Sequence, residues 1–222
     1  MNIAIIPARK SSKRIKNKNI INFFGQPMIA HTIQSLLKMK LFDKIIVSSD
    51  SQIILNIAKK NGAETFIRSH KLSTDKVPTF DVIKDVIKNL SYPIDNVCCL
   101  YSTSLFIKKK YISDSFKILK KNKHSLIMSV CKYTHPIERS FLLKTNNELV
   151  FRYPKNKLKQ TQSFKSSYYD AAQFALSNSK FYTNSSFKKK SKILGYVLDD
   201  SETTDIDTKE DLIKAKKIYK RS

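Results

Sequence analysis

NIAIIPARKSSKRIKNKNI, residues 2–20, sets an apolar run directly before a polar loop. Residues 2–7 are predicted to form a strand, because they are rich in isoleucine and apolar on both faces. The loop at residues 8–20 carries six cations among thirteen residues. Lys, Arg and hydroxyl groups that follow a central strand can hold a triphosphate through charge-assisted hydrogen bonds. A solvated charge run is the alternative, and the position directly after the first strand favours phosphate.

Downstream of this loop, helical patterns alternate with short apolar runs. The pattern predicts helices at residues 27–40, 51–61, 79–90 and 110–121, and strands at 43–48, 64–67, 96–100 and 125–131. Such alternation, with strands apolar on both faces, predicts a single-domain three-layer α/β/α fold with a Rossmann-like, mostly parallel sheet. Ligands of such a fold bind beyond the carboxyl ends of the strands.

The alternation breaks at residues 134–168, which are polar, aromatic and proline-containing. We interpret this segment as an inserted arm within one domain of residues 1–222, with a dimer contact as one use. Two further strands are predicted at residues 171–176 and 193–198, and a helix at 208–219. Thr208 with Asp211 resembles a capping arrangement at the start of that helix.

Composition limits the class of protein. With 222 residues and 41% hydrophobic residues, the chain can fill one core. It has no run of 18 apolar residues, and its N-terminal apolar stretch precedes its positive charges, so we expect a cytoplasmic protein without membrane insertion. The three cysteines lack the spacing of a zinc site and the even count of a disulfide framework, so we expect reduced core thiols.

The formal net charge of +24 raises the alternative of a nucleic-acid binder. Only six of the 42 basic residues are arginine, and the lysines are spread through every segment. A protein that reads nucleic acid more often clusters arginine beside aromatic residues. We therefore expect no specific nucleic-acid partner, although a positive field would attract small anionic ligands.

Six motifs together resemble one enzyme family. IIPARKSSKRIKNKNI at residues 5–20 is similar to the pattern IIPARGGSKRIKNKN of the sialic acid (acylneuraminate) cytidylyltransferases, and most similar to their pseudaminic acid branch. The family's order and spacing continue through LFDKIIVSSDS, residues 68–75, SLIMSVCKYTHPIER, YYDAAQF and DIDTKEDL. The resemblance covers essentially the whole chain and implies the nucleotide-diphospho-sugar transferase type of fold.

The resemblance implies a set of nucleotide-binding residues. In the opening loop it assigns the phosphates and ribose of CTP to Arg9, Ser12, Lys13, Lys18 and Asn19. Arg and Lys suit this role, because they can offset charge on a leaving pyrophosphate. Farther along, Arg68 and Thr79 match family positions around the cytosine and the nucleotide. For Arg68 the alternative is a strand-end surface charge, and Asp50 is either a helix cap or a site residue.

Asp205 and Asp207 alternate across Ile206 near the C-terminus. Residues two apart in an extended segment point to the same side, so both carboxylates can address one hard cation. The resemblance implies Mg²⁺ at this motif. The alternative is that Asp207 merely caps the last helix.

The sugar site is expected around the segment that resembles DAGQF of the pseudaminic branch. Asp170 and Gln173 would face the sugar, together with Thr103 and Ser104 at a strand end. The chain also departs from the family: Lys10 and Ser11 replace paired glycines, Ala172 replaces the glycine of DAGQF, and the strand-end segment lacks the family's prolines. Loss of loop glycine puts nucleotide affinity or loop geometry in question, because close backbone approach to phosphate favours glycine.

The resemblance implies that CMP from CTP is joined to a nine-carbon acidic sugar, a nonulosonic acid, with release of pyrophosphate. Arg9, Lys13, Lys18 and Asp207 would be its catalytic residues, and a homodimer is expected by analogy. Pseudaminic acid is the expected sugar, with N-acetylneuraminic or legionaminic acid as alternatives and octulosonate as a more remote one. A catalytically lapsed CTP-binding homologue is the alternative from another class.

Overall fold

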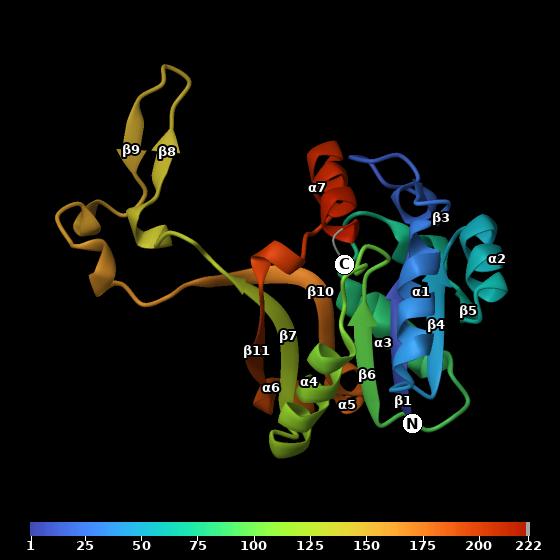
Figure 1. The fold of residues 1–222 in the computed structure, drawn as a ribbon. Helices are drawn as coiled ribbons and strands as arrows, with labels where there is room; N and C mark the ends of the chain where they lie inside the picture. Colours follow the sequence, from blue (N-terminus) through green and yellow to red (C-terminus); the bar gives the residue numbers. More distant parts are fainter. Residues whose placement is uncertain (221–222) are drawn as a thin grey trace.

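A seven-stranded sheet forms the centre of the computed structural model, which describes residues 1–220 (Figure 1). Its strand order is β11-β7-β10-β6-β1-β4-β5. The strands are β1 (Asn2–Pro7), β4 (Lys44–Ser49), β5 (Glu64–Ile67), β6 (Asn96–Leu100), β7 (Ser125–Lys132), β10 (Tyr168–Asn178) and β11 (Lys192–Leu198). β10 runs antiparallel to both of its neighbours, and the other pairs are parallel. The mostly parallel sheet is confirmed.

Helices cover both faces of the sheet, which confirms the three-layer prediction. They are α1 (Met28–Met39), α2 (Gln52–Lys60), α3 (Thr79–Asn89), α4 (Lys109–Lys121), α5 (Lys180–Thr183) and α6 (Ser185–Lys190). The last helix, α7 (Lys209–Tyr219), packs instead in a separate core with Phe23 and Met28. Alternate residues of β1 point to opposite faces. Ala4 and Ile6 pack in one core with residues of α1, α2 and α4, whereas Ile3 and Ile5 pack in another with residues of α3 and α5.

The predicted helix and strand bounds differ from the structure by two residues or fewer, except for β10, which extends beyond both predicted ends. Pro27 is the N-cap of α1 rather than its first residue. Two short helices, α5 and α6, were not predicted, and the triple lysine at 188–190 is the last turn of α6. Lys188 has a tertiary partner there, since its Nζ lies 3.5 Å from the centre of the Phe80 ring.

The remaining core predictions agree with the structure. Thr208 and Asp211 form a capping box, with the backbone and side-chain bonds present in both directions. The three cysteines are free and buried. Burial raises the pKa of Cys99 to about 12, so this thiol stays protonated at neutral pH. Within residues 1–220 no helix is long and apolar enough to cross a membrane.

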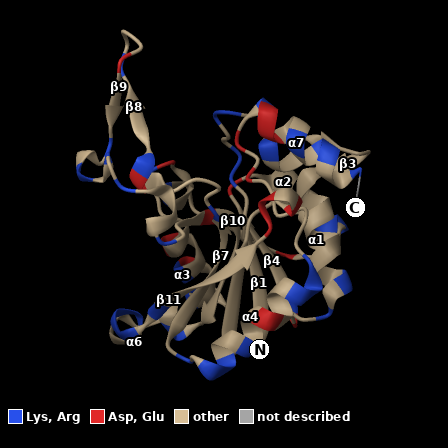
Figure 2. Ribbon diagram, turned by 60° about the vertical axis from the view of Figure 1, so that its left-hand side comes forward, with Lys and Arg blue, Asp and Glu red and all other residues tan. Residues whose placement is uncertain are grey.

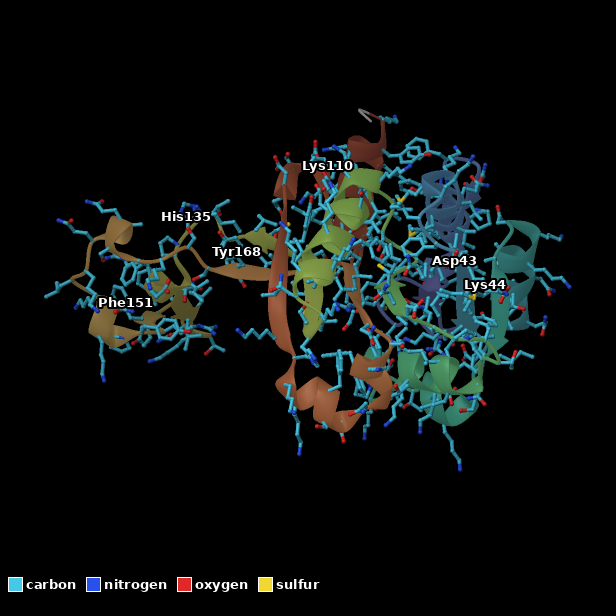
Figure 3. The ribbon with its side chains drawn as sticks, turned by 90° about the horizontal axis from the view of Figure 1, so that it is seen from below. Asp43, Lys44, Lys110, His135, Phe151 and Tyr168 are labelled. Atoms are coloured by element: carbon cyan, nitrogen blue, oxygen red, sulfur yellow. The ribbon has the colours of Figure 1, made fainter. Side chains whose placement is uncertain are left out.

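Residues 133–167 leave the domain as a slender extension (Figure 1). Its hairpin joins β8 (Phe141–Leu143) to β9 (Leu149–Phe151), and these strands pair only with each other among the described residues. Figure 3 shows Phe151 and His135 on this extension, well apart from Asp43 and Lys44 of the domain. We call residues 133–167 the arm.

Lysine and arginine recur on α1, α4, α6, α7 and the arm (Figure 2). The positive charge is therefore spread over elements on several sides of the molecule, as the dispersed lysines of the sequence predicted.

The strand β10 is irregular where it passes the carboxyl end of β6. Its register with β7 shifts between Asp170 and Ala175, which marks a β-bulge. Inside this bulge Ala172 has a φ of 49°, in the left-handed region that favours glycine. Bulges of this kind re-aim side chains and often border functional sites.

Candidate functional site

A cavity of about 610 Å³ lies beyond the carboxyl ends of β1 and β6, beside the bulge of β10. It is lined by Pro7, Arg9, Ser12, Lys13, Arg14, Lys18, Asn19, Arg68, Leu72, Thr74, Asp75, Val77, Thr79, Val82, Tyr101, Ser102, Thr103, Ala172, Asp205 and Asp207. The structure thus brings together every predicted nucleotide residue, both predicted metal ligands and Thr103. Five of the lining residues are basic and three are aspartates, so the wall carries a net positive charge.

Hydrogen bonds from three parts of the chain hold the loop at residues 8–20. The backbone N–H of Lys10 donates to Asp50 Oδ1 at 2.7 Å. Asn19 Nδ2 donates to the carbonyl of Arg9 at 2.7 Å, and Asn19 Oδ1 accepts from Ser102 Oγ. Asn19 therefore fixes the shape of the loop with both ends of its amide. Asp50 anchors the loop and does not cap α2, because Ser51 occupies that N-cap.

The lost glycines do not strain this loop. Neither Lys10 nor Ser11 has a positive φ, and in residues 8–20 only Asn17 does, at 56°. The backbone conformation at residues 10 and 11 is thus open to residues with side chains. Glycine at these positions would let a phosphate approach the loop backbone more closely, but the backbone conformation itself does not require glycine.

One aspartate neutralises two of the loop's cations. Asp75 Oδ1 pairs with Arg9, and Asp75 Oδ2 lies 2.5 Å from Lys13 Nζ. Asp75 follows the short turn at His70–Ser73 and precedes α3. Asp75 is the last residue of the family-like segment at residues 68–75, but the resemblance assigns no role to it. No local pattern in the sequence links Asp75 to Arg9.

A second aspartate, Asp207, neutralises two further cations of the loop. Asp207 Oδ1 lies 2.9 Å from Lys18 Nζ, and Asp207 Oδ2 lies 2.7 Å from Arg14 Nη2. Lys18 also donates to the carbonyl of Ile206 at 2.7 Å. Arg14 was not assigned a role from the sequence, although the cation density of its loop pointed to it.

Asp205 and Asp207 meet the requirements of a site for one hard cation. Both line the cavity, and the Asp205 carboxylate makes no ion pair within residues 1–220. Although Asp205 is open to the cavity, desolvation by the surrounding wall and the neighbouring Asp207 raise its pKa. Asp207 does not cap α7, since the N-cap is Thr208.

No group of three His, Cys, Asp or Glu side chains gathers as a metal site among the described residues. Mg²⁺ needs no such cage, because it is held by one or two carboxylates and takes phosphate oxygens and water as its other ligands. The donor set of Asp205 and Asp207 therefore fits this ion when a nucleotide is present.

Arg68 is a buried cation with unused donors. It is 6% exposed, and its Nε and Nη2 have no hydrogen-bond partner. Burial lowers the pKa of Arg68. The charge of Asp50 opposes this shift, since Asp50 Oδ1 lies 3.9 Å from Arg68 Nη2. The alternative of a strand-end surface charge is therefore wrong. An unsatisfied buried guanidinium facing a cavity is a site for a polar or anionic ligand.

Thr79 and Tyr101 stand on the same cavity wall as the apolar residues Leu72, Val77 and Val82. Burial raises the pKa of Tyr101, against a hydrogen bond with Thr79 that lowers it. This part of the lining combines apolar side chains with a few polar groups, which is typical of a pocket for a heterocyclic base.

Three of the four predicted sugar residues do not line the cavity, and two of these, Ser104 and Gln173, are buried. Ser104 is fully buried, and its Oγ donates to the carbonyl of Gln173 at 2.6 Å. Gln173 is 1% exposed, and its Nε2 donates to the carbonyls of Ala171 at 3.0 Å and Thr204 at 3.3 Å. The expectation that Gln173 faces the sugar is therefore wrong, because the bulge turns its side chain into the wall.

The other two lie nearer to the open space. Thr103 is on the cavity wall. Asp170 is exposed, and its Oδ1 accepts from the backbone N–H of Ala172 at 2.8 Å. Ala172 itself lines the cavity, so the residue that departs from the family's glycine borders the ligand space.

A second cavity of about 600 Å³ adjoins the first. Arg68, Thr74 and Asp75 line both cavities, and the wall of the second is completed by Lys10, Ser11, Asp50, His70 and Ser73. Asp75 thus stands between the two spaces.

The comparisons with known proteins agree with this geometry. A family model described as cytidylyltransferase matches residues 3–221. Pseudaminic acid cytidylyltransferase of Campylobacter jejuni is 34% identical over 99% of this chain and 96% of its own length. N-acylneuraminate cytidylyltransferase of Escherichia coli is 28% identical over 94% of this chain and 50% of its own length.

Among solved structures, CMP:2-keto-3-deoxy-manno-octonic acid synthetase complexed with CTP matches with a TM-score of 0.74. The match covers 99% of this chain and 98% of that one at 13% identity, so it concerns the fold alone.

Proposed function

The chain belongs to the cytidylyltransferase family, and from that premise we propose that it joins CMP from CTP to a nonulosonic acid, with pseudaminic acid as the sugar. The observation that carries the proposal is one cavity lined by both the cations of the loop at residues 8–20 and the carboxylate pair Asp205 and Asp207. This distribution suits a metal-bound triphosphate. The full-length similarity to the pseudaminic acid enzymes supports the choice of sugar.

In this proposal the triphosphate lies along the loop at residues 8–20. Arg9, Lys13 and Lys18 give up their aspartate partners, wholly or in part, and bind phosphate oxygens, while the Ser12 hydroxyl donates to another. These preorganised donors stabilise the charge that develops on the departing pyrophosphate. Asn19, whose amide is occupied by Arg9 and Ser102, contributes by fixing the loop.

The base occupies the wall with Arg68 and Thr79. The unused Nε and Nη2 donors of Arg68 support this assignment, because a ligand with acceptor atoms would satisfy them. Leu72, Val77 and Val82 offer apolar surface for the ring.

The sugar occupies the remaining wall, beside Thr103, Ala172 and the exposed Asp170. Its anomeric hydroxyl oxygen bonds to the α-phosphorus of CTP as the bond from that phosphorus to the bridging oxygen of pyrophosphate breaks. The hydroxyl proton is released. Positioning of the two substrates in line supplies most of the acceleration in transfers of this kind.

We assign Asp205 and Asp207 to Mg²⁺, which would lower the pKa of the attacking hydroxyl and screen the phosphates. Both carboxylates line the cavity and would hold the ion there. Asp207 also keeps Lys18 and Arg14 in place while the site is empty.

We further propose a homodimer formed through the arm. The arm exposes large apolar residues, including Leu143 at 67%, Leu149 at 59% and Leu158 at 93%. The edge strand β11 exposes Ile193 and Val197 on the domain. A second copy that covers both surfaces would remove this apolar area from water. A cytoplasmic location is proposed because CTP, the proposed substrate, is made there.

Pyrophosphate release with CTP and Mg²⁺ tests the proposal, with pseudaminic, legionaminic and N-acetylneuraminic acids in parallel. We expect release with pseudaminic acid, and a product with the mass of the CMP-sugar. Asp207→Asn is expected to lose this turnover, and Glu210→Gln, in the exposed first turn of α7, to retain it. CTP binding without turnover on any of the three sugars would contradict the proposal and indicate a lapsed enzyme.

A further inference from the structure

Asp75 is an anion in a place where an anionic ligand is proposed to bind. Its carboxylate oxygens take one cation each, Arg9 on Oδ1 and Lys13 on Oδ2. It differs from the other two aspartates of the cavity, which fit a metal ion. Neither Asp205 nor Asp207 pairs with Arg9 or Lys13 within residues 1–220. The role of Asp75 is therefore not that of a third metal ligand.

A carboxylate and a phosphate are alternative acceptors for the same donors. Guanidinium and ammonium groups bind both through short, charge-assisted bonds. A phosphate that approaches Arg9 and Lys13 must displace Asp75 or share its cations at close range, and two anions at such range repel each other. The side chains of Arg9 and Asp75 are both a little over one third exposed, at 37% and 36%, so these pairs can open without unfolding the core.

The cost of this displacement is the same for different phosphate ligands, but the binding energy available to offset it is not. Inorganic phosphate or pyrophosphate can gain only the contacts that the loop cations offer. A cytidine nucleotide gains additional contacts at Arg68, Thr79 and the apolar wall, and these can offset the loss of the Asp75 pairs. An equal penalty lowers every affinity by the same factor, so a weakly bound small anion leaves the site empty at concentrations at which the nucleotide still binds.

We propose that Asp75 holds Arg9 and Lys13 in the empty site and lowers the affinity of these cations for every phosphate ligand, which keeps weakly bound small phosphate anions out of the site. The inference rests on the proposed function, because it takes Arg9 and Lys13 as triphosphate ligands. It adds a reason why free phosphate and the pyrophosphate product, which lack the contacts of the nucleoside, occupy the site only weakly. Release of pyrophosphate is then assisted, because the returning carboxylate competes for the same two cations.

Calorimetric titration of the full chain with pyrophosphate, inorganic phosphate and CTP tests this role. Asp75→Asn keeps the size of the side chain and removes its charge. We expect the variant to bind pyrophosphate about three- to tenfold more tightly than the wild type, since two partly exposed ion pairs no longer compete. CTP affinity is expected to rise by a similar factor, because CTP displaces the same two pairs, and the inhibition constant of pyrophosphate in the transfer reaction to fall in parallel with its dissociation constant.

Asp85→Asn is the matched control. Asp85 lies on α3, outside both cavities, and its substitution makes the same change in net charge. It is expected to leave pyrophosphate affinity within twofold of the wild type. Circular dichroism and thermal melting verify that both variants fold, and Asp75→Ala serves as a second variant if the asparagine still pairs with Lys13.

Unchanged or weaker pyrophosphate binding by folded Asp75→Asn and Asp75→Ala would overturn the proposal. Loss of CTP binding in both would also overturn it, because Asp75 would then be a direct ligand of the nucleotide. These titrations need no sugar. Failure of the proposed sugar transfer is therefore distinguishable from failure of the role of Asp75.

Discussion

The ammonium group of Lys18 lies 2.9 Å from Asp207 Oδ1, across 189 residues of sequence. It joins the loop after the first strand to the segment before the last helix, and the carbonyl of Ile206 accepts a second bond from the same ammonium. The proposed triphosphate loop and the proposed metal ligands are therefore fixed relative to each other before any substrate binds.

Lys18→Met is expected to lower kcat/KM by about 10²-fold, the usual cost of removing one preorganised donor to a developing negative charge. Steady-state pyrophosphate release at saturating Mg²⁺ measures the effect. Lys16→Met is the matched control, since Lys16 is an exposed lysine of the same loop that does not line the cavity. Equal losses in the two variants would indicate a general effect of loop charge and contradict a specific role of Lys18.

The raised pKa of Asp205 predicts a pH-dependent metal requirement. A proton competes with Mg²⁺ for this carboxylate, so the half-saturating Mg²⁺ concentration should fall as pH rises through the raised pKa. Asp205→Asn should need more Mg²⁺ and lose this pH dependence. An Mg²⁺ requirement that is flat across the acid range in the wild type would count against Asp205 as a metal ligand.

The raised pKa of Asp205 also predicts how the stability of the fold changes with pH. The fold favours protonated Asp205, so this group's contribution is present below its unfolded-state pKa and is lost as pH rises through the raised pKa. Asp205→Asn should therefore be at least as stable as the wild type at neutral pH. A lower melting temperature of that variant at neutral pH, in the absence of metal and nucleotide, would contradict the assigned shift.

We expect Gln173 to act by holding the segment before Asp205 in place and not by contact with the sugar. Gln173→Met keeps the approximate volume but removes the bonds to the Ala171 and Thr204 carbonyls, and it also removes the buried Oε1, which has no partner. Because the second change partly offsets the first, we expect a loss of about 1 kcal/mol in the free energy of unfolding. Because Thr204 precedes Asp205, we also expect a higher half-saturating Mg²⁺ concentration, with KM for the sugar little changed. Gln162→Met on the arm is the control. A selective rise in KM for the sugar would instead restore Gln173 as a sugar ligand.

Ala172→Gly is expected to stabilise the protein by about 1 kcal/mol, because a left-handed conformation costs alanine roughly 1–2 kcal/mol that glycine avoids. Urea unfolding measures the change. Ala175→Gly is the control, since Ala175 lies in the same strand with regular pairing to Cys99, and there glycine should destabilise. Destabilisation by Ala172→Gly would mean that the methyl group makes packing contacts worth more than the strain.

The exposed apolar surface of the arm predicts that the protein is a dimer. Leu143→Lys combined with Leu149→Glu places opposite charges on a cross-strand pair, so the hairpin is retained while its apolar surface is lost. Light scattering after size-exclusion chromatography should give a dimer for the wild type and a monomer for this variant. Ile53→Glu, at an exposed apolar residue of α2, should remain dimeric. A monomeric wild type would rule out the proposed dimer.

Much of the site could be predicted from local sequence. The position of the loop after β1, the spacing of Asp205 and Asp207, and the order of the motifs brought ten of the predicted residues to one cavity wall. Gln173 was misplaced because a strand pattern assumes regular alternation, and the bulge of β10 breaks it. Ser104 lies in the turn after β6, where its hydroxyl accepts from the backbone N–H of Tyr101 and donates to the carbonyl of Gln173, and no local pattern in the sequence indicates these bonds. Asp75 and Arg14 were missed because their partners lie far away in the sequence.

The sequence by itself determined the layered fold, because the apolar periodicity of each segment is a local property that the sheet and helices obey. It also determined which residue types meet at the carboxyl ends of the strands. Only the tertiary structure decided how these residues are paired: Asp75 with Arg9 and Lys13, Asp207 with Arg14 and Lys18, and Gln173 with the wall. Charge pairing depends on distance in space, and residues from distant segments acquire that distance only when the chain has folded.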